Sequence, residues 1–116
     1  MARFISGEVV VLPFPFTDFS STKVRPALVL ASLARGDVML CQITSQAGTH
    51  AAGVPIAPSD FELGGGLPLA SFALPHRIVT AHESCVLRRA GRLKAVKLEA
   101  IRESVCAVVR GHGGTP

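Results

Sequence analysis

The sequence predicts a mainly β domain, a small curled sheet or barrel that is followed by one C-terminal helix. Three observations predict this class: many short apolar segments lie between glycine and proline turns, a helical period occurs only near the C-terminal end, and strands do not alternate with helices. A length of 116 residues with 48% hydrophobic and 17% charged side chains fits one compact core. We therefore expect a single domain over residues 1–116, with an ordered part of about residues 4–110 and a short glycine-rich tail.

The first strand is predicted from the β-branched run at residues 8–12, which continues through Pro13-Phe14-Pro15-Phe16. Because prolines two residues apart remove N–H donors on the same side, this strand should finish at a sheet edge or a bulge. The polar segment 17–23 that follows is predicted to be a surface loop.

Two more strands are predicted before residue 46. Arg25 should be extended, because the proline after it disfavours helical backbone. The uninterrupted apolar run 27–32 is typical of a strand buried on both faces. After a turn at 35–37, residues 38–45 form a third strand whose polar end can face a cleft.

The middle of the chain is rich in turns. A short strand is expected near 54–57, and residues 69–80 form either a strand pair or one long strand broken at Pro75. The triple glycine 64–66 is interpreted as a hinge or turn, because no Lys-Ser/Thr pair and no helix follow it as a phosphate-binding loop requires. Residues 83–89 are expected to add another short strand.

The single helix is predicted after Arg92-Leu93. Apolar residues recur there at spacings of three and four, which is the period of one helix face. These residues are Leu98, Ile101, Val105, Val108 and Val109. Glycines from Gly111 onward end the pattern.

The charge balance is mildly basic, with 12 Lys and Arg against 8 Asp and Glu and a net charge of +4. The excess is concentrated between residues 77 and 110, which is compatible with an anionic partner. The basic residues there are Arg77, Arg88, Arg89, Arg92, Lys94, Lys97, Arg102 and Arg110, against Glu83, Glu99 and Glu103.

The three cysteines show no CxxC pair and no histidine at ligand spacing, so we expect buried thiols in a reducing cytosol and neither a metal site nor a cofactor. The N-terminal apolar stretch is interrupted by prolines and lacks a cleavage site, so no signal peptide is predicted. No apolar run is long enough to span a bilayer. We therefore predict a cytoplasmic protein without membrane contact.

Four blocks occur in an order and spacing that resemble the MazF/PemK-like toxins of bacterial toxin–antitoxin systems. They are GEVV at 7–10, PFPFTD at 13–18, RPALVL at 25–30 and CQITSQ at 41–46, and the likeness spans about residues 4–106. The resemblance implies an SH3-like β-barrel with a C-terminal helix, a homodimer, and metal-independent cleavage of single-stranded RNA. It also implies inhibition by a cognate antitoxin protein.

The resemblance implies a catalytic role for Arg25 in the Arg-Pro-Ala block and for Thr44 at the end of the third strand. A guanidinium suits this chemistry because it offers a phosphate two parallel donors and stays charged. Residue chemistry alone favours a solvated loop arginine at Arg25, and it also allows an ordinary strand threonine at Thr44. Further residues are expected to contact RNA. They are Phe16, Thr17, Lys23, Ser45, Gln46, Ser71 and Arg77.

The chain departs from the family pattern at Leu74 and His76, where many relatives carry an arginine and an aspartate. Residues 72, 74, 76 and 78 are expected to share one strand face. His76 is a candidate general base because imidazole titrates near neutral pH, although a lone histidine among apolar neighbours is more often packed and hydrogen-bonded. The departure leaves two alternatives open: a non-catalytic barrel that binds RNA or protein, and a poison that grips a protein such as gyrase.

Overall fold

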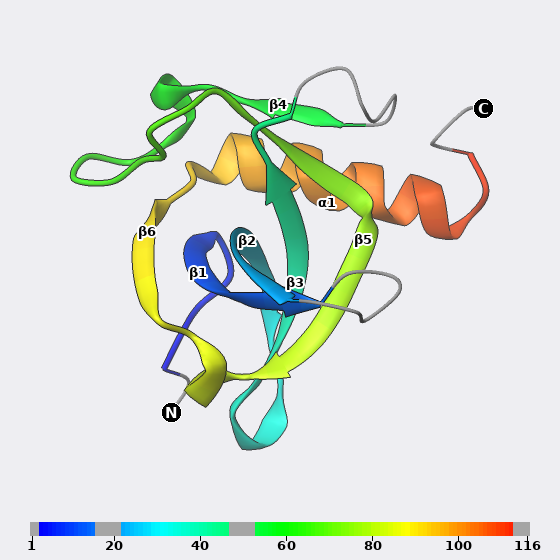
Figure 1. The fold of residues 1–116 in the computed structure, drawn as a ribbon. Coiled ribbons are helices and arrows are strands. Elements are labelled where there is room, and N and C mark those ends of the chain that lie inside the picture. The colour runs from blue at the N-terminus through cyan, green and yellow to red at the C-terminus, as the bar shows by residue number, and fades with distance from the viewer. Residues whose placement is uncertain (1–2, 16–21, 47–52, 113–116) are drawn as a thin grey trace.

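The computed structural model describes residues 3–15, 22–46 and 53–112, and it confirms the mainly β class with a C-terminal helix (Figure 1). Within these residues, six antiparallel strands form one sheet in the order β4-β5-β3-β2-β1-β6. The strands are β1 Glu8–Pro15, β2 Thr22–Ser32, β3 Asp37–Thr44, β4 Val54–Ile56, β5 Ser71–His82 and β6 Arg88–Arg92. The helix α1 spans Ala95–Val109, and short 3-10 turns occupy Ala34–Gly36, Pro58–Asp60 and Glu83–Cys85.

The second strand is longer than predicted. Residues Thr22 and Lys23, which the sequence assigned to a loop, pair in β2 with Pro15 and Phe14 of β1. Arg25 is extended as expected, but it lies within the strand rather than at its start. The polar segment fails as a loop indicator here because backbone pairing with β1 continues past the end of the apolar run.

The sheet is curled, and the segment that follows β4, residues 61–66, contacts β6 and the residue after it (Figure 1). The Glu62 N–H donates to the Arg92 carbonyl at 2.8 Å and the Gly66 N–H donates to the Ala90 carbonyl at 2.9 Å. A Cβ atom on Gly65 would lie 2.4 Å from the Cα of Gly91. The triple glycine therefore does more than turn the chain, because Gly65 lets two backbones approach closely enough to close the barrel.

Apolar side chains pack on both faces of the sheet. One cluster contains Val9, Leu28, Cys41 and Ile43 together with the inner face of α1, and the other contains Phe4, Val10, Leu12, Phe14, Ala27, Val29, Val38 and Leu40. The helix begins at Ala95, three residues before the predicted stripe, and buries Leu98, Ile101 and Val105. Val109, which the stripe included, is 80% exposed because α1 extends beyond the sheet it covers.

The β5 strand is one continuous strand, and it is irregular where Pro75 lies. Cys41 pairs with Ile78, but Ile43 pairs with Ala73, so β5 carries additional residues opposite a regular stretch of β3. Ala73 and Leu74 are both buried whereas His76 is exposed. The predicted shared face of residues 72, 74, 76 and 78 is therefore wrong, because the irregularity breaks the two-residue alternation.

Only one of the three cysteines is buried as predicted. The Cys41 thiol lies in the core and donates to the Leu74 carbonyl at 3.2 Å. Burial raises the pKa of this thiol from 9.0 to about 12, against a smaller lowering effect from a backbone hydrogen bond of Leu74. Cys85 and Cys106 are exposed, which corrects the prediction for both.

Among the described residues, no cluster of three or more His, Cys, Asp or Glu side chains has the geometry to hold a metal ion. Within the same part of the chain, no helix has the length and hydropathy that a membrane span requires.

Candidate functional site

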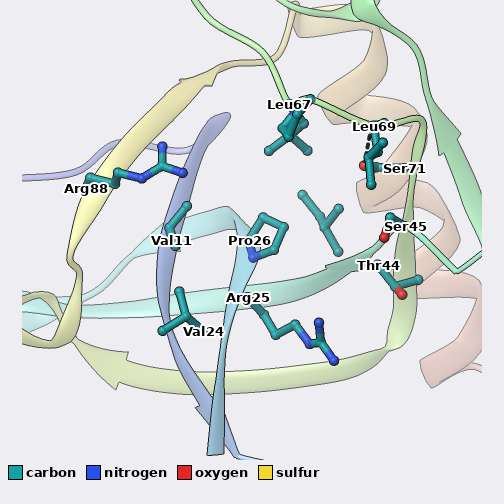
Figure 2. Close-up of a pocket in the computed structure, with 12 residues that line it drawn as sticks. Val11, Val24, Arg25, Pro26, Thr44, Ser45, Leu67, Leu69, Ser71 and Arg88 are labelled. Carbon is teal, nitrogen blue, oxygen red and sulfur yellow. Dashed lines mark hydrogen bonds between the residues drawn. The ribbon is translucent and has the colours of Figure 1, made fainter.

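A pocket opens where β2 and β3 separate. The two strands pair from Ser32 to Ala27, whose partner is Gln42, and Pro26 beyond that pair has no N–H to donate. From there, β2 continues against β1, whereas Ile43 and Thr44 of β3 pair with β5. The space between the separated strand ends forms a cavity of about 240 Å³ (Figure 2).

The pocket is mainly apolar, with polar groups at its margins. Its lining consists of Val11, Val24, Arg25, Pro26, Ile43, Thr44, Ser45, Leu67, Pro68, Leu69, Ser71 and Arg88. Val24 is 54% exposed and Leu69 is 64% exposed, so the apolar walls are open to a ligand. The two ionisable lining residues are both arginines, so the pocket favours an anionic group.

Arg25 is partly buried, and its guanidinium extends toward the side of the pocket that Thr44 and Ser45 border (Figure 2). Arg25 belongs to the part of β2 that has left β3, where none of the described strands pairs with that side of the backbone. The separation of the strands therefore gives a cation access to the end of β3.

The hydroxyl of Thr44 is oriented by the turn that ends β3. The backbone N–H of Gln46 donates to Oγ1 of Thr44 at 3.1 Å, a side-chain-to-backbone contact typical of threonine turns. Because the oxygen accepts this bond, the hydroxyl proton is directed elsewhere and is available to a ligand acceptor. Thr44 can thus donate to an oxyanion at the pocket margin.

Ser71 lies beside Leu69 in the pocket lining, on the same side as Ser45 and Thr44 (Figure 2). Its side chain is buried and its Oγ donates to the Leu69 carbonyl at 2.8 Å. This bond uses the only proton of the hydroxyl, so toward a ligand Ser71 can act as an acceptor. Its clearest contribution is to fix Leu69, which lines the pocket beside it (Figure 2).

Adjacent arginines of β6 take different environments. The pairing of β1 with β6 shifts between Val9 and Val10, where β6 contains one extra residue. Arg89 Nε donates to Glu8 at 2.7 Å, and its guanidinium lies 4.4 Å from the ring centre of Phe4. Arg88 instead lines the pocket, and Figure 2 shows its side chain at the end away from Thr44.

The structure brings together four of the predicted site residues: Arg25, Thr44, Ser45 and Ser71 all line the pocket. Gln46 supports Thr44 through its backbone. Lys23 is exposed on β2, and His76 and Arg77 lie on β5, and these three are not among the lining residues. Phe16 and Thr17 lie outside the described residues.

Sequence reasoning missed the apolar lining, which comes from Val11, Val24 and the segment 67–69. From the sequence, Arg88 was one member of a basic run compatible with an anionic partner, with nothing to distinguish it from its neighbours. Side chains alternate between the two faces of a strand, and this alternation could have shown which arginine of β6 faces the pocket. The bulge opposite Val9 and Val10 breaks the alternation, so the sequence does not show it. Leu74, at the position where many relatives carry arginine, is 1% exposed and contributes to the core instead.

Comparison with known proteins gives one family and a consistent fold. Residues 5–109 match the model of the PemK-like, MazF-like toxin of type II toxin–antitoxin systems. A comparison with curated proteins gives no match.

Among solved structures, the chain is similar to an endoribonuclease in complex with its cognate antitoxin from a mycobacterial species, with 19% identity, a TM-score of 0.70, and coverage of 94% of this chain and 96% of that one. It is also similar to MazE-MazF from Deinococcus radiodurans, with 19% identity, a TM-score of 0.71 and coverage of 92% and 96%. The Mycobacterium tuberculosis toxin MazF-mt6 shows 20% identity, a TM-score of 0.60 and coverage of 87% and 96%. At these identities the likeness shows the fold.

Proposed function

Because the chain belongs to the PemK-like, MazF-like toxin family of type II toxin–antitoxin systems, we propose that it is an endoribonuclease that cleaves single-stranded RNA at the pocket between β2 and β3. The observation that carries the proposal is the meeting of Arg25 and Thr44 at one pocket margin. These two residues are the ones that the family resemblance marks as catalytic. Solved structures of similar fold include endoribonucleases, which supports the same assignment.

The proposed reaction is attack of a ribose 2′-oxygen on the adjacent phosphorus, with departure of the 5′-oxygen of the next nucleotide. The 2′-hydroxyl gives up its proton, the leaving oxygen gains one, and the products carry a 2′,3′-cyclic phosphate and a 5′-hydroxyl. Arg25 stabilises the pentacoordinate phosphorane through two parallel N–H donors. Thr44 donates its free proton to a non-bridging oxygen.

The proton transfers need a group that titrates near neutral pH, and the arginines of the pocket cannot supply one. His76 of β5 is the candidate base, proposed for its chemistry rather than for its place, since it lies outside the pocket lining. A His76→Gln variant tests this role: loss of the acidic limb of the pH–rate profile supports it, and an unchanged profile contradicts it.

The proposed partners follow from the family. The chain acts as a homodimer in the cytoplasm, on single-stranded RNA, and a cognate antitoxin holds it inactive. Light scattering at micromolar concentration should give the mass of a dimer, and a monomer mass would contradict that assignment. Co-expression with the neighbouring open reading frame should relieve growth arrest.

The test of the proposed activity is incubation of the purified protein with mixed-sequence single-stranded RNA in EDTA, with fragments resolved on a gel. The control is the same sequence made with 2′-O-methyl ribose, which has no 2′-hydroxyl proton to lose. We expect cleavage of the RNA alone, without added metal. No cleavage by folded protein across varied RNAs would favour a non-catalytic binding barrel, and cleavage of the methylated strand would contradict attack by the 2′-oxygen.

A further inference from the structure

We infer that Arg88 binds a second phosphate of the RNA. The pocket then holds one nucleotide between two cations. Arg25 binds the phosphate on one side of the base, and Arg88 binds the phosphate on the other side. The inference rests on the proposed function in that the ligand is a single-stranded RNA. It goes beyond that function by assigning a residue from β6, outside the four blocks of family likeness, to substrate binding.

Strand pairing places the two cations at opposite ends of the pocket. Val11 of β1 pairs with Arg88 on one side and with Pro26, the neighbour of Arg25, on the other. Two strand spacings therefore separate Arg88 from β2, a backbone distance of about 10 Å. Figure 2 shows the same arrangement, with Arg88 reaching in from β6 and Arg25 extending toward the far side. One guanidinium cannot serve both ends at this separation.

The contacts of the β6 arginines distinguish Arg88 from its neighbours. The guanidinium of Arg89 is engaged by the Glu8 carboxylate, the Arg3 carbonyl and the Phe4 ring. Arg92 borders a separate groove with Glu8 and the glycines of the barrel closure. Within the described part of the chain, Arg88 makes no ion pair, so its charge is available to a ligand.

The walls between the two arginines suit a base. They are formed by Val24, Pro26 and Leu69, and the cavity of about 240 Å³ is smaller than the roughly 300–1,000 Å³ that accommodates drug-sized ligands. A flat apolar ring can lie on aliphatic and proline side chains, and its neighbouring phosphates then extend toward the polar margins. Such a surface contacts base faces and offers few polar groups to base edges.

The experiment measures binding of a fluorescein-labelled 2′-deoxy oligonucleotide, which has no 2′-hydroxyl and so separates binding from cleavage. Fluorescence anisotropy is recorded over a range of NaCl concentrations for the wild type and for Arg88→Gln. The matched control is Arg92→Gln, which removes the same charge from the same strand but from the other groove. Arg88→Lys retains the charge without the guanidinium fork.

We expect Arg88→Gln to weaken binding about tenfold at low salt. It should also reduce the slope of log affinity against log salt by about 0.7, the value for one lost phosphate contact on a single strand. Arg88→Lys should retain the wild-type slope, and Arg92→Gln should change it less than Arg88→Gln does. The inference would be overturned if Arg88→Gln had the same slope of log affinity against log salt as the wild type. It would also be overturned if Arg88→Gln and Arg92→Gln lost the same amount of oligonucleotide affinity.

The same data separate this inference from the proposed activity. If the wild type binds the deoxy strand with an Arg88-dependent slope but cleaves no RNA, the phosphate site stands and the catalytic assignment fails. If the wild type cleaves RNA and Arg88→Gln leaves both KM and the salt slope unchanged, the second phosphate site fails and the activity stands. Absence of any binding by the wild type would overturn the site as well.

Discussion

The C-terminal half of β2, residues 27–32, pairs with β3, and its first two residues, Ala27 and Leu28, pair with β1 as well. Among the described strands, the N-terminal half, residues 22–26, pairs with β1 alone. In the C-terminal half, Leu28 is fully buried and packs with Val9 and Cys41 in the cluster beneath α1. In the N-terminal half, Val24 is 54% exposed and Arg25 borders the pocket. One strand thus supplies core at one end and candidate site at the other, and the division falls where pairing with β3 stops.

The comparison predicts that stability and activity can be altered separately along the same strand. Substitutions in residues 27–32 should act on the free energy of unfolding. Substitutions in residues 22–26 should act on RNA cleavage or binding. A substitution in residues 27–32 that alters only cleavage, or one in residues 22–26 that alters only stability, would contradict this division.

The largest expected effect is on folding. Leu28→Ala removes a fully buried side chain and leaves a cavity between β2 and α1, which should lower the free energy of unfolding by about 2–5 kcal/mol. Urea unfolding followed by circular dichroism measures the change. Val24→Ala, in the exposed half, is the control and should alter stability by less than about 0.5 kcal/mol. Equal decreases in the free energy of unfolding for Leu28→Ala and Val24→Ala would show that the two halves of β2 contribute alike to stability.

The next effect is on catalysis. Arg25→Ala removes the donors proposed to stabilise the phosphorane, so the cleavage rate should fall by about 10²–10³. The free energy of unfolding should remain close to that of the wild type, since the side chain borders the pocket. Arg25→Lys keeps the charge and should recover only part of the rate. Full cleavage activity in Arg25→Ala would contradict the assignment of the catalytic site to this half of β2.

A smaller loss is expected at the end of β3. Thr44→Val keeps the shape and the strand preference but removes the hydroxyl, and loss of a hydrogen bond to a charged phosphate should reduce cleavage about tenfold or more. Thr44→Ser keeps the hydroxyl and is the matched control. If the valine variant cleaves as fast as the serine variant, the hydroxyl that Gln46 orients has no part in the reaction.

The buried half should also show a pH dependence of its own. Cys41 pairs with Leu28, and burial raises the pKa of its thiol from 9.0 to about 12. Between these values the unfolded chain loses the proton while the folded chain keeps it, so stability falls as pH rises, by up to about 1.4 kcal/mol per pH unit.

This contribution is fully present below pH 9.0 and is lost as pH rises toward 12. The free energy of unfolding is measured at about pH 8 and at about pH 10. Its decrease between these two pH values should be smaller for Cys41→Ala than for the wild type. Cys106→Ala removes an exposed thiol and should retain the wild-type difference. Identical pH dependence in all three proteins would contradict burial of the Cys41 thiol.

The smallest expected effect is at the apolar wall. Leu69→Ala shortens a side chain that lines the pocket and is 64% exposed, so it should weaken oligonucleotide binding by a few-fold without changing stability. The salt slope should stay the same, because no phosphate contact is lost. Leu63→Ala removes an exposed leucine that does not line this pocket and should bind as the wild type does.

The sequence was most informative where local pattern and tertiary pairing agree. The apolar runs of β2 and β3 and the period of α1 predict those elements, and the Arg25-Pro26 pair and Thr44 mark the point where the strands separate. These signals are local: proline lacks a donor, and a strand end exposes its last side chains. The fold class and the meeting of Arg25 and Thr44 at one cleft were therefore predictable.

What the sequence could not predict depends on irregular pairing. The extra residues in β5 reverse the alternation near Leu74, and the shift between β1 and β6 decides that Arg88 rather than Arg89 faces the pocket. The role of Gly65 depends on its approach to Gly91, which is distant in the chain. Each of these features is a property of two strands together, and a one-strand pattern carries no information about the partner.

The most direct test of the account is a map of where single-stranded nucleic acid binds. The wild type, labelled in its methyl groups and backbone amides, is titrated with a 2′-deoxy oligonucleotide and followed by NMR. Binding at the pocket between β2 and β3 should give the largest shift changes at Val24, Thr44 and Leu69. Leu28 and the exposed outer face of α1 near Val96 should be little affected. Changes centred on that face of α1, with none at the opening between β2 and β3, would contradict it.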